Sequence, residues 1–375
     1  MTILDLLANG EDQHIAIAAP EHKPMSYAAL REQCRVVAGE LGDQGLGAND
    51  RIAMVLPNGP EMASSFVALA NVVTAAPLNP AYTTAEFKFY LSDLNAKAIL
   101  VAAGDDTPAR EVARQIGIGV IELHASQNSA AGSFELDFGS MPRADHYRVS
   151  SDTHIGLVLH TSGTTSRPKI VPLSEANLCA SARHISATLS LSTIDNCLNV
   201  MPLFHIHGLI AGVLSSLHAG ACVTCTPGFN ALKFFSWLQV IKPTWYTAVP
   251  TMHQAILARA GRNKVTVAAA RLRFIRSSSS SLPSQVMQLL EETFSCPVIE
   301  SYGMTEAAHQ MTSNELPPGS RKAGSVGVPA GPEVRLMDAS GDFVASGEKG
   351  EIVIRGDNIT AGYEANVAAN ASAFV

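Results

Sequence analysis

The chain has 375 residues, of which 47% are hydrophobic, and a formal net charge of −7 with a pI near 5.9. This length predicts two or three domains, and the apolar content is sufficient for a large core and argues against disorder. The negative charge argues against nucleic acid or an anionic membrane as the main partner, and no apolar run reaches the length of a membrane span.

The N-terminal segment and the cysteines indicate the compartment. MTILDLLANGEDQ is acidic and lacks the basic flank and cleavage site of a secretory signal. The six cysteines are sparse and mostly lie in apolar segments, which suits a reducing environment. We therefore expect a cytoplasmic protein, and the sequence favours no particular oligomeric state.

The first part of the chain alternates between short apolar strands and amphipathic helices. Strands are expected over 51–56, 75–78, 98–102 and 119–123, with helices over 60–74, 84–93 and 110–116. The stretch 126–148 is polar and irregular and contains Gly, Ser and Pro, which is typical of a linker between lobes.

The second part repeats the alternation. Strands are expected over 155–159, 198–201, 221–226, 245–249, 272–276 and 297–301, with helices over 174–189, 209–218, 231–241, 250–260 and 284–293. From about residue 312 the pattern changes to strands over 333–337 and 351–355 between Gly-rich turns.

This pattern predicts an α/β fold with two mainly parallel sheets flanked by helices. It also predicts a small β-barrel-like subdomain at the C-terminal end. We expect the chain to divide into a first α/β subdomain over 1–150, a second α/β subdomain with the ligand site over 151–311, and the β subdomain over 312–375. Ligands in such folds bind at the carboxyl ends of strands.

The segment HTSGTTSRPKIVP, residues 160–172, follows one of these strands. Its cations are Arg167 and Lys169, and its small residues are Thr161, Ser162, Gly163, Thr164, Thr165 and Ser166. A flexible loop of this kind can direct N–H groups, hydroxyls and cations at a polyphosphate. It is not the common P-loop, because Gly-Lys-Ser/Thr is absent at the required spacing. A solvated Ser/Thr loop is the alternative interpretation.

The segment TSGTTSRPK resembles the phosphate loop of adenylate-forming enzymes, which include acyl-CoA synthetases, luciferases and nonribosomal-peptide adenylation domains. Ser166 replaces the usual glycine, and Lys169-Ile170 often reads Lys-Gly in that family. The Ser-Arg-Pro-Lys variant is most similar to oxalate–CoA ligases. PLNPAYTTAE at 77–86 and GEIVIRGDNITAGYEAN at 350–366 fit the same family in the same order. The resemblance therefore implies the large N-terminal domain of such an enzyme.

The segment SYGMTE, residues 301–306, follows another expected strand. Tyr302 offers a ring for stacking, Thr305 a hydroxyl and Glu306 a hard oxygen ligand for Mg²⁺. An ordinary strand-to-helix loop is the alternative. The resemblance implies that the ring contacts adenine and that Thr305 and Glu306 serve phosphate and metal. The predicted nucleotide contacts in this block also include Glu300, Ser301 and Gly303.

Serines and histidines at other strand ends are candidates for the acid pocket. By resemblance, Ser278, Ser279 and Ser280 form a wall shared by the adenine and acyl sites, with Ser280 on the nucleotide side. His205 takes the position that controls the approach of the carboxylate to the α-phosphate, and His207 falls among acyl-pocket residues. His309 follows Glu306 by three residues and can share its cavity. Alternatively, His207 packs in the core and His309 faces solvent.

The implied reaction joins a carboxylate to AMP from ATP with release of pyrophosphate, and then transfers the acyl group to coenzyme A. Catalysis is expected to depend on charge neutralisation and alignment by Mg²⁺, Lys169 and the donors of the phosphate loop, with Glu306 as the metal ligand and His205 at the reacting carboxylate. The polar pocket favours a very small acid, oxalate first, over other dicarboxylates, 4-coumarate or medium-chain acids. An amino-acid adenylation domain is disfavoured, because 204–207 contain no Asp. A non-catalytic nucleotide-binding module is the other alternative.

In that family, a ribose-binding Asp, a hinge and a small C-terminal domain with an adenylating Lys follow the motif at 350–366. This chain ends at Val375 without them. We therefore expect the chain to bind ATP·Mg²⁺ more weakly than a full-length relative and to form little acyl-CoA by itself.

Overall fold

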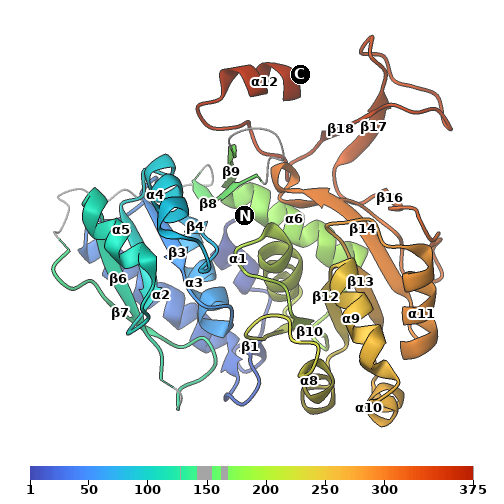
Figure 1. Ribbon diagram of the computed structural model, residues 1–375, viewed down its shortest axis with the longest axis horizontal. Helices are drawn as coiled ribbons and strands as arrows, with labels where there is room; N and C mark the ends of the chain where they lie inside the picture. Colours follow the sequence, from blue (N-terminus) through green and yellow to red (C-terminus); the bar gives the residue numbers. More distant parts are fainter. Residues whose placement is uncertain (127, 142–153, 162–167, 375) are drawn as a thin grey trace.

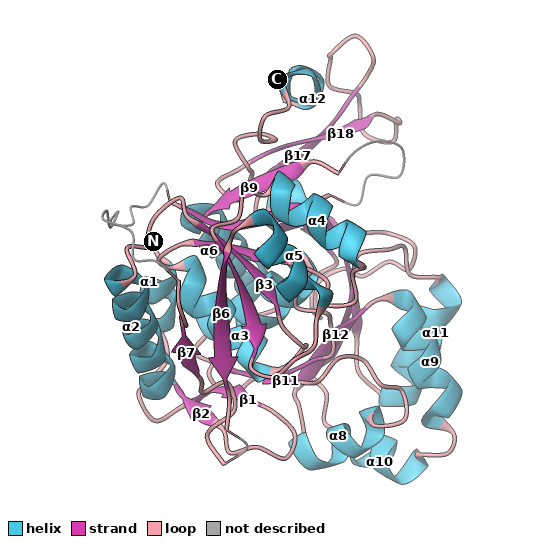
Figure 2. Ribbon diagram, turned by 60° about the vertical axis from the view of Figure 1, so that its left-hand side comes forward, coloured by secondary structure: helices cyan, strands magenta, loops and turns pink. Residues whose placement is uncertain are grey.

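Two helix-flanked sheets lie side by side and make up most of the molecule (Figures 1 and 2). The structure, a computed structural model, describes residues 1–126, 128–141, 154–161 and 168–374. No helix among these residues is both long and apolar enough to cross a membrane.

The first sheet has seven strands in the order β7-β6-β5-β3-β4-β8-β9, and its inner pairs are parallel. The strands are β3 (Arg51–Val55), β4 (Thr74–Pro77), β5 (Ala98–Ala102), β6 (Gly119–His124), β7 (Glu135–Asp137), β8 (Ile155–His160) and β9 (Ile170–Ser174). The helices between them are α3 (Pro60–Ala70), α4 (Thr84–Asp93) and α5 (Pro108–Ile116). The edge strands β7 and β9 pair antiparallel.

The second sheet has nine strands in the order β16-β15-β14-β13-β12-β10-β11-β1-β2. They are β1 (Ile15–Ala18), β2 (Met25–Ser26), β10 (Asn196–Asn199), β11 (Cys222–Cys225), β12 (Trp245–Ala248), β13 (Phe274–Ser277), β14 (Val298–Met304), β15 (His309–Ser313) and β16 (Val328–Pro329). The pairs from β1–β11 to β13–β14 are parallel, so β10, β12, β13 and β14 present their carboxyl ends at one edge.

The remaining elements connect or cover these sheets. They are α1 (Ile3–Leu7), α2 (Tyr27–Asp43), α6 (Glu175–Thr188), a π-helix (His207–Leu214), α7 (Ser215–His218), α8 (Phe234–Ile241), α9 (Pro250–Ala260), α10 (Lys264–Ala269), α11 (Ser284–Phe294), a 3₁₀ turn (Thr305–Ala307) and α12 (Val367–Ala373). The antiparallel ribbon of β17 (Glu333–Met337) and β18 (Glu351–Arg355) projects from the body together with α12 (Figure 1).

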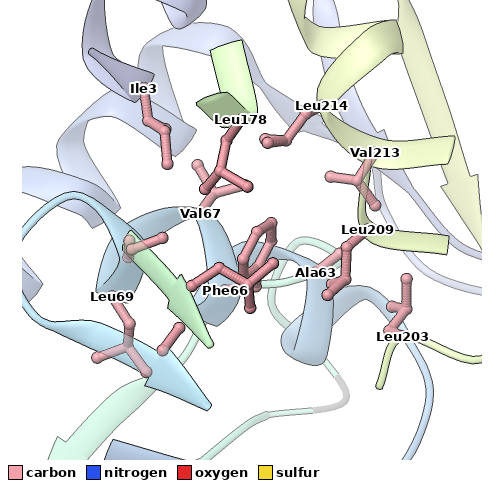
Figure 3. Packing of buried hydrophobic residues seen from close by; sticks show 14 of the residues in the cluster. Ile3, Ala63, Phe66, Val67, Leu69, Leu178, Leu203, Leu209, Val213 and Leu214 are labelled. Carbon is pink, nitrogen blue, oxygen red and sulfur yellow. The ribbon is translucent and has the colours of Figure 1, made fainter. Parts of the chain in front are cut away.

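The largest buried cluster includes residues that belong to both sheets and to the helices between them. Phe66 and Val67 of α3 lie at its centre, close to Leu178 of α6 and Leu209 of the π-helix (Figure 3). Ten of the eleven residues of α3 are buried, including Ser64 and Ser65, and only Glu61 is partly exposed. A helix that is buried all round is typical of a position between two sheets, so this cluster fixes the sheets relative to each other.

The predicted α/β class with two parallel-dominated sheets and a small β region is confirmed. The sheets nevertheless do not divide at residue 150. Residues 15–26 contribute β1 and β2 to the second sheet, whereas β8 and β9 join the first sheet beside β4. Local alternation of strands and helices identifies the strands, but it does not specify which distant strand each one pairs with.

Several boundaries also differ from the prediction. The predicted helix over 209–218 begins at His207 as a π-helix, in which Asn199 Nδ2 donates to the Gly208 carbonyl at 3.1 Å. A side chain that binds a backbone carbonyl in place of the helical N–H donor is a common cause of a local departure from α-helical geometry. The predicted linker contains β7, and residues 142–153 within it lie outside the described part of the chain. In the predicted C-terminal subdomain, 328–329 pair with the large sheet instead.

Candidate functional site

A cavity of about 560 Å³ opens where the carboxyl ends of the second sheet meet β8 and β9 of the first. Its walls are Leu159, His160, Thr161, Lys169, Met201, Phe204, His205, Ile206, His207, Val249, Ser279, Gly303, Met304, Thr305, Glu306 and His309. They include nine of the residues predicted for the site. The expectation that ligand-binding residues gather at strand ends therefore matches the geometry.

The two ends of the predicted phosphate loop lie on the cavity wall. Thr161 N donates to the Lys169 carbonyl at 2.9 Å, and Lys169 N donates to Thr161 Oγ1 at 3.2 Å, so the base of the loop is closed by paired contacts. The predicted contacts of Ser162, Gly163, Thr164, Thr165 and Ser166 lie outside the described residues.

Lys169 and Glu306 are linked by a tyrosine that the sequence analysis did not select. Lys169 Nζ lies 4.1 Å from the ring centroid of Tyr363, and Tyr363 Oη donates to Glu306 Oε1 at 2.6 Å. Burial and this hydrogen bond to Glu306 raise the pKa of Tyr363, so the phenol stays protonated as a donor. Tyr363 lies in the segment 350–366, which fits the resembling family. That membership was the only feature of the sequence that could have pointed to Tyr363 as a site residue.

Only the second half of the 300–306 block reaches the cavity. Gly303, Thr305 and Glu306 line it, and a Cβ at Gly303 would lie 1.5 Å from the His309 carbonyl, so only glycine fits there. Tyr302 is 36% exposed and does not line the cavity described here. The alternative of an ordinary strand-to-helix loop over 301–306 is wrong, because β14 continues to Met304 and pairs with β15.

The first two residues of this block, Glu300 and Ser301, are buried and do not line the cavity. Glu300 Oε1 accepts from Leu282 N at 2.8 Å, and burial raises the pKa of this carboxyl group. Ser301 Oγ donates to the Ser277 carbonyl at 3.5 Å. Glu300 thus connects β14 to the loop before α11, and Ser301 connects β14 to the end of β13.

Of the three predicted serines, only Ser279 lines the cavity. Ser278 is buried and its Oγ donates to the Ser301 carbonyl at 3.0 Å, whereas Ser280 is exposed. Ser279 has a positive φ of 70°, a strained conformation for a residue with a side chain. This conformation accompanies a hydrogen bond between Ser279 Oγ and His207 Nδ1 at 2.9 Å.

All three predicted histidines line the cavity. His207 and His309 are almost fully buried, and their rings stack with centroids 4.9 Å apart and an interplanar angle of 21°. The interpretation that His309 faces solvent is therefore excluded. Burial lowers the pKa of His205, and it lowers the pKa of His207 and His309 well below the ordinary value. Both stacked imidazoles are consequently neutral at physiological pH.

A buried arginine behind these histidines was missed. Arg276 is fully buried in β13 and reaches both His207 and His309. Its signal in the sequence was a charged residue that follows the apolar pair Phe274 and Ile275 in the expected strand over 272–276, just before the serine run. A charge in a buried strand requires a partner, which is a reason to examine it.

The profile of the family described as AMP-binding enzyme matches residues 6–364. The chain belongs to this family. It is 42% identical to the oxalate–CoA ligase of Arabidopsis thaliana over 358 residues, which cover 93% of this chain and 69% of that protein. It is also 36% identical over 352 residues to the oxalate–CoA ligase of Saccharomyces cerevisiae, covering 87% of this chain and 63% of that protein.

Solved structures of more distant proteins share the fold. ATP-bound MatB from Rhodopseudomonas palustris has a TM-score of 0.85 and 24% identity over 99% of this chain and 74% of its own. A benzoate CoA ligase from Burkholderia xenovorans LB400 has a TM-score of 0.83 and 22% identity. The match covers 98% of this chain and 74% of that protein. The resemblance to the adenylate-forming enzymes is thus confirmed by both family membership and fold.

The buried neutral histidines predict acid sensitivity of the AMP-binding fold. Their folded-state pKa lies below the value of about 6.5 in the unfolded chain, so the unfolded chain binds more protons as the pH falls below 6.5. The stability present above pH 6.5 is then lost at up to about 1.4 kcal/mol per histidine for each pH unit. Urea unfolding at pH 7.5, 6.0 and 5.0 measures this slope.

Replacing His309 by Gln removes one of these groups. The slope of unfolding free energy against pH between 6.5 and 5 should therefore be smaller in His309→Gln than in the original protein. Equal slopes for the two proteins would contradict the assignment of a buried neutral imidazole.

Proposed function

We propose that the protein activates a small carboxylic acid, oxalate in the first place, by forming an acyl-adenylate from ATP, and then transfers the acyl group to coenzyme A. The observation that carries the proposal is the meeting of two kinds of group in one cavity. The ends of the phosphate loop and Glu306 line the same cavity as the three predicted histidines and Ser279. The names of the two relatives reported above support the choice of acid.

The chemistry requires a carboxylate oxygen to attack the α-phosphorus of ATP as the bond to the pyrophosphate oxygen breaks. Both reactants are anions, so the protein must neutralise charge and align the two groups. Lys169 supplies a cation at the cavity wall, and His205, in the loop after β10, lines the same cavity. In the second step the thiol sulfur attacks the acyl carbon, and AMP leaves with the electron pair of the broken C–O bond.

Thr305 and Glu306 fit a Mg²⁺ ion that accompanies the triphosphate. Mg²⁺ prefers a small number of protein carboxylates together with phosphate oxygens, and Glu306 is a partly exposed carboxylate on the cavity wall. When bound, the ion supplies charge neutralisation at the phosphates. Tyr363 fixes one oxygen of Glu306, which holds this carboxylate in position before the nucleotide arrives.

The acid pocket is polar where a pocket for a larger acid would be apolar. His207, His309 and Ser279 are neutral hydrogen-bonding groups on the cavity wall. A second carboxylate of a small diacid would find donors there, whereas the chain of hexanoate or the ring of 4-coumarate would leave these groups unpaired. This contrast favours oxalate over the apolar acids.

Lys169→Ala should weaken the binding of ATP more than that of AMP, because its charge is assigned to the outer phosphates. We expect a loss of about tenfold or more for ATP and less than about threefold for AMP, as for removal of one close ionic contact. Isothermal calorimetry with each nucleotide measures both. Lys264→Ala, at an exposed lysine on α10, is the control. Equal losses for the two nucleotides would overturn the assignment.

Tyr363→Phe tests the support of Glu306. The variant keeps the ring beside Lys169 but removes the hydroxyl that donates to Glu306. We expect the affinity for ATP in the presence of Mg²⁺ to fall about three- to tenfold, and the affinity for AMP without Mg²⁺ to stay the same. A variant that binds Mg²⁺-ATP as tightly as the original protein would refute this role.

The acid itself is tested by binding in the presence of saturating AMP. We expect oxalate to bind most tightly, malonate less tightly, and hexanoate and 4-coumarate weakest. His309→Gln should weaken oxalate binding while AMP binding is retained. Tighter binding of hexanoate or 4-coumarate than of oxalate would contradict the proposed substrate class.

A further inference from the structure

Arg276 is a buried cation without an acidic partner. It is fully buried in β13, and its guanidinium contacts are His207 Nε2 at 3.3 Å, His309 Nε2 at 3.1 Å and Gln310 Oε1 at 3.3 Å. Within the described part of the chain, no carboxylate forms an ion pair with it, and its Nε has no hydrogen-bond partner. A buried charge of this kind is costly unless an opposite charge approaches it.

The positive charge of Arg276 persists at neutral pH. Burial lowers the pKa of its guanidinium to about 9, which still leaves the group protonated. The two groups beside it are neutral imidazoles, because burial and the arginine itself oppose their protonation. The cluster therefore carries one net positive charge directly behind the wall of the acid pocket.

The contacts of Arg276 also determine the tautomers of both histidines. A guanidinium can only donate, so Nε2 of His207 and Nε2 of His309 must accept from it. Thr247 Oγ1 lies closer to His207 Nε2, at 2.6 Å, so the hydroxyl and the guanidinium share the single lone pair of this nitrogen. Neutral imidazoles that accept at Nε2 carry their proton on Nδ1.

With these tautomers, hydrogen-bond donors become available on the cavity wall. His207 Nδ1–H donates to Ser279 Oγ at 2.9 Å, so the hydroxyl hydrogen of Ser279 is left for another acceptor. Ser279 and His309 both line the cavity. The pocket thus presents hydrogen-bond donors backed by a buried cation, which suits an anionic group and disfavours a neutral one.

We infer that Arg276 is the specificity-determining positioning residue of the acid pocket: acting through His207 and His309, it selects acids that carry a second negative charge. This inference rests on the proposed function and deepens it. The ligand class is a small dianionic acid, whose first carboxylate faces the nucleotide and whose second faces Ser279 and His309. Arg276 acts through the histidines, since it does not itself line the cavity.

The test compares oxalate with oxamate, which has nearly the same size and shape but only one negative charge. Binding is measured by calorimetry with saturating AMP and without divalent metal, because oxalate itself chelates Mg²⁺. We expect the original protein to prefer oxalate by about tenfold or more, as for one additional buried ionic contact.

Arg276→Gln should remove this preference. Oxalate affinity is expected to fall about 10- to 100-fold, while oxamate affinity changes less than about threefold. Arg271→Gln, the same replacement at an exposed arginine five residues earlier, should leave both affinities unchanged. An unchanged preference in Arg276→Gln, or equal losses for both acids in a folded variant that binds AMP, would overturn the inference.

A second measurement does not depend on any variant. Nitrogen-15 NMR of the unmodified, histidine-labelled protein reports the tautomer of each imidazole. Both stacked histidines should be Nδ1–H tautomers, and an Nε2–H tautomer at either one would overturn the inference. If AMP binds and oxalate does not, both the proposed function and the role of Arg276 fail. If oxalate binds and Arg276→Gln has no effect, only the role of Arg276 fails.

Discussion

The site depends on the placement of one hairpin across the junction of two sheets. β8 and β9 belong to the first sheet, yet Thr161 after β8 and Lys169 before β9 line the same cavity as the strand ends of the second sheet. The segment 358–364 holds this arrangement by hydrogen bonds to both sides. Thr360 Oγ1 donates to the Pro172 carbonyl of β9 at 2.6 Å, while Thr360 N donates to the Glu306 carbonyl at 2.8 Å. Tyr363 adds the contact to the Glu306 carboxylate, so the position of Glu306 is fixed relative to Lys169.

The charged groups of the site differ in their exposure to solvent. Lys169 and Glu306 are charged groups on the open wall, where phosphates and a metal ion can be exchanged with solvent. His207 and His309, which line the same cavity, are neutral imidazoles in contact with the buried charge of Arg276. Such an arrangement preserves a positive potential in the pocket without placing an exposed cation next to the reacting carboxylate, where it would compete for the nucleotide phosphates. Under the proposed function, this separation is the reason why a histidine pair, and not a lysine or arginine, lines the cavity beside the acid.

The sequence predicted the fold class and most of the cavity wall because both depend on local patterns. Alternating strands and helices specify parallel sheets, and polar residues after strands gather at one edge, as Lys169, His207 and Glu306 do. Pairing between distant strands is not encoded locally, which is why the exchange of β1 and β8 between the sheets was missed. The direction of each side chain within a turn could not be predicted from the sequence pattern either. Ser279 lines the cavity, whereas Ser278 donates to the Ser301 carbonyl.

The central claim is that one cavity accommodates an adenylate whose acyl part carries a second negative charge. Its most direct test is the affinity of the protein for acylsulfamoyl-adenosine analogues, which resemble acyl-AMP and require no turnover. The account predicts that the oxalyl analogue binds at least about tenfold more tightly than the hexanoyl analogue, since only the former reaches the histidine pair with a carboxylate. Equal binding of the two, or tighter binding of the hexanoyl analogue, would contradict the account.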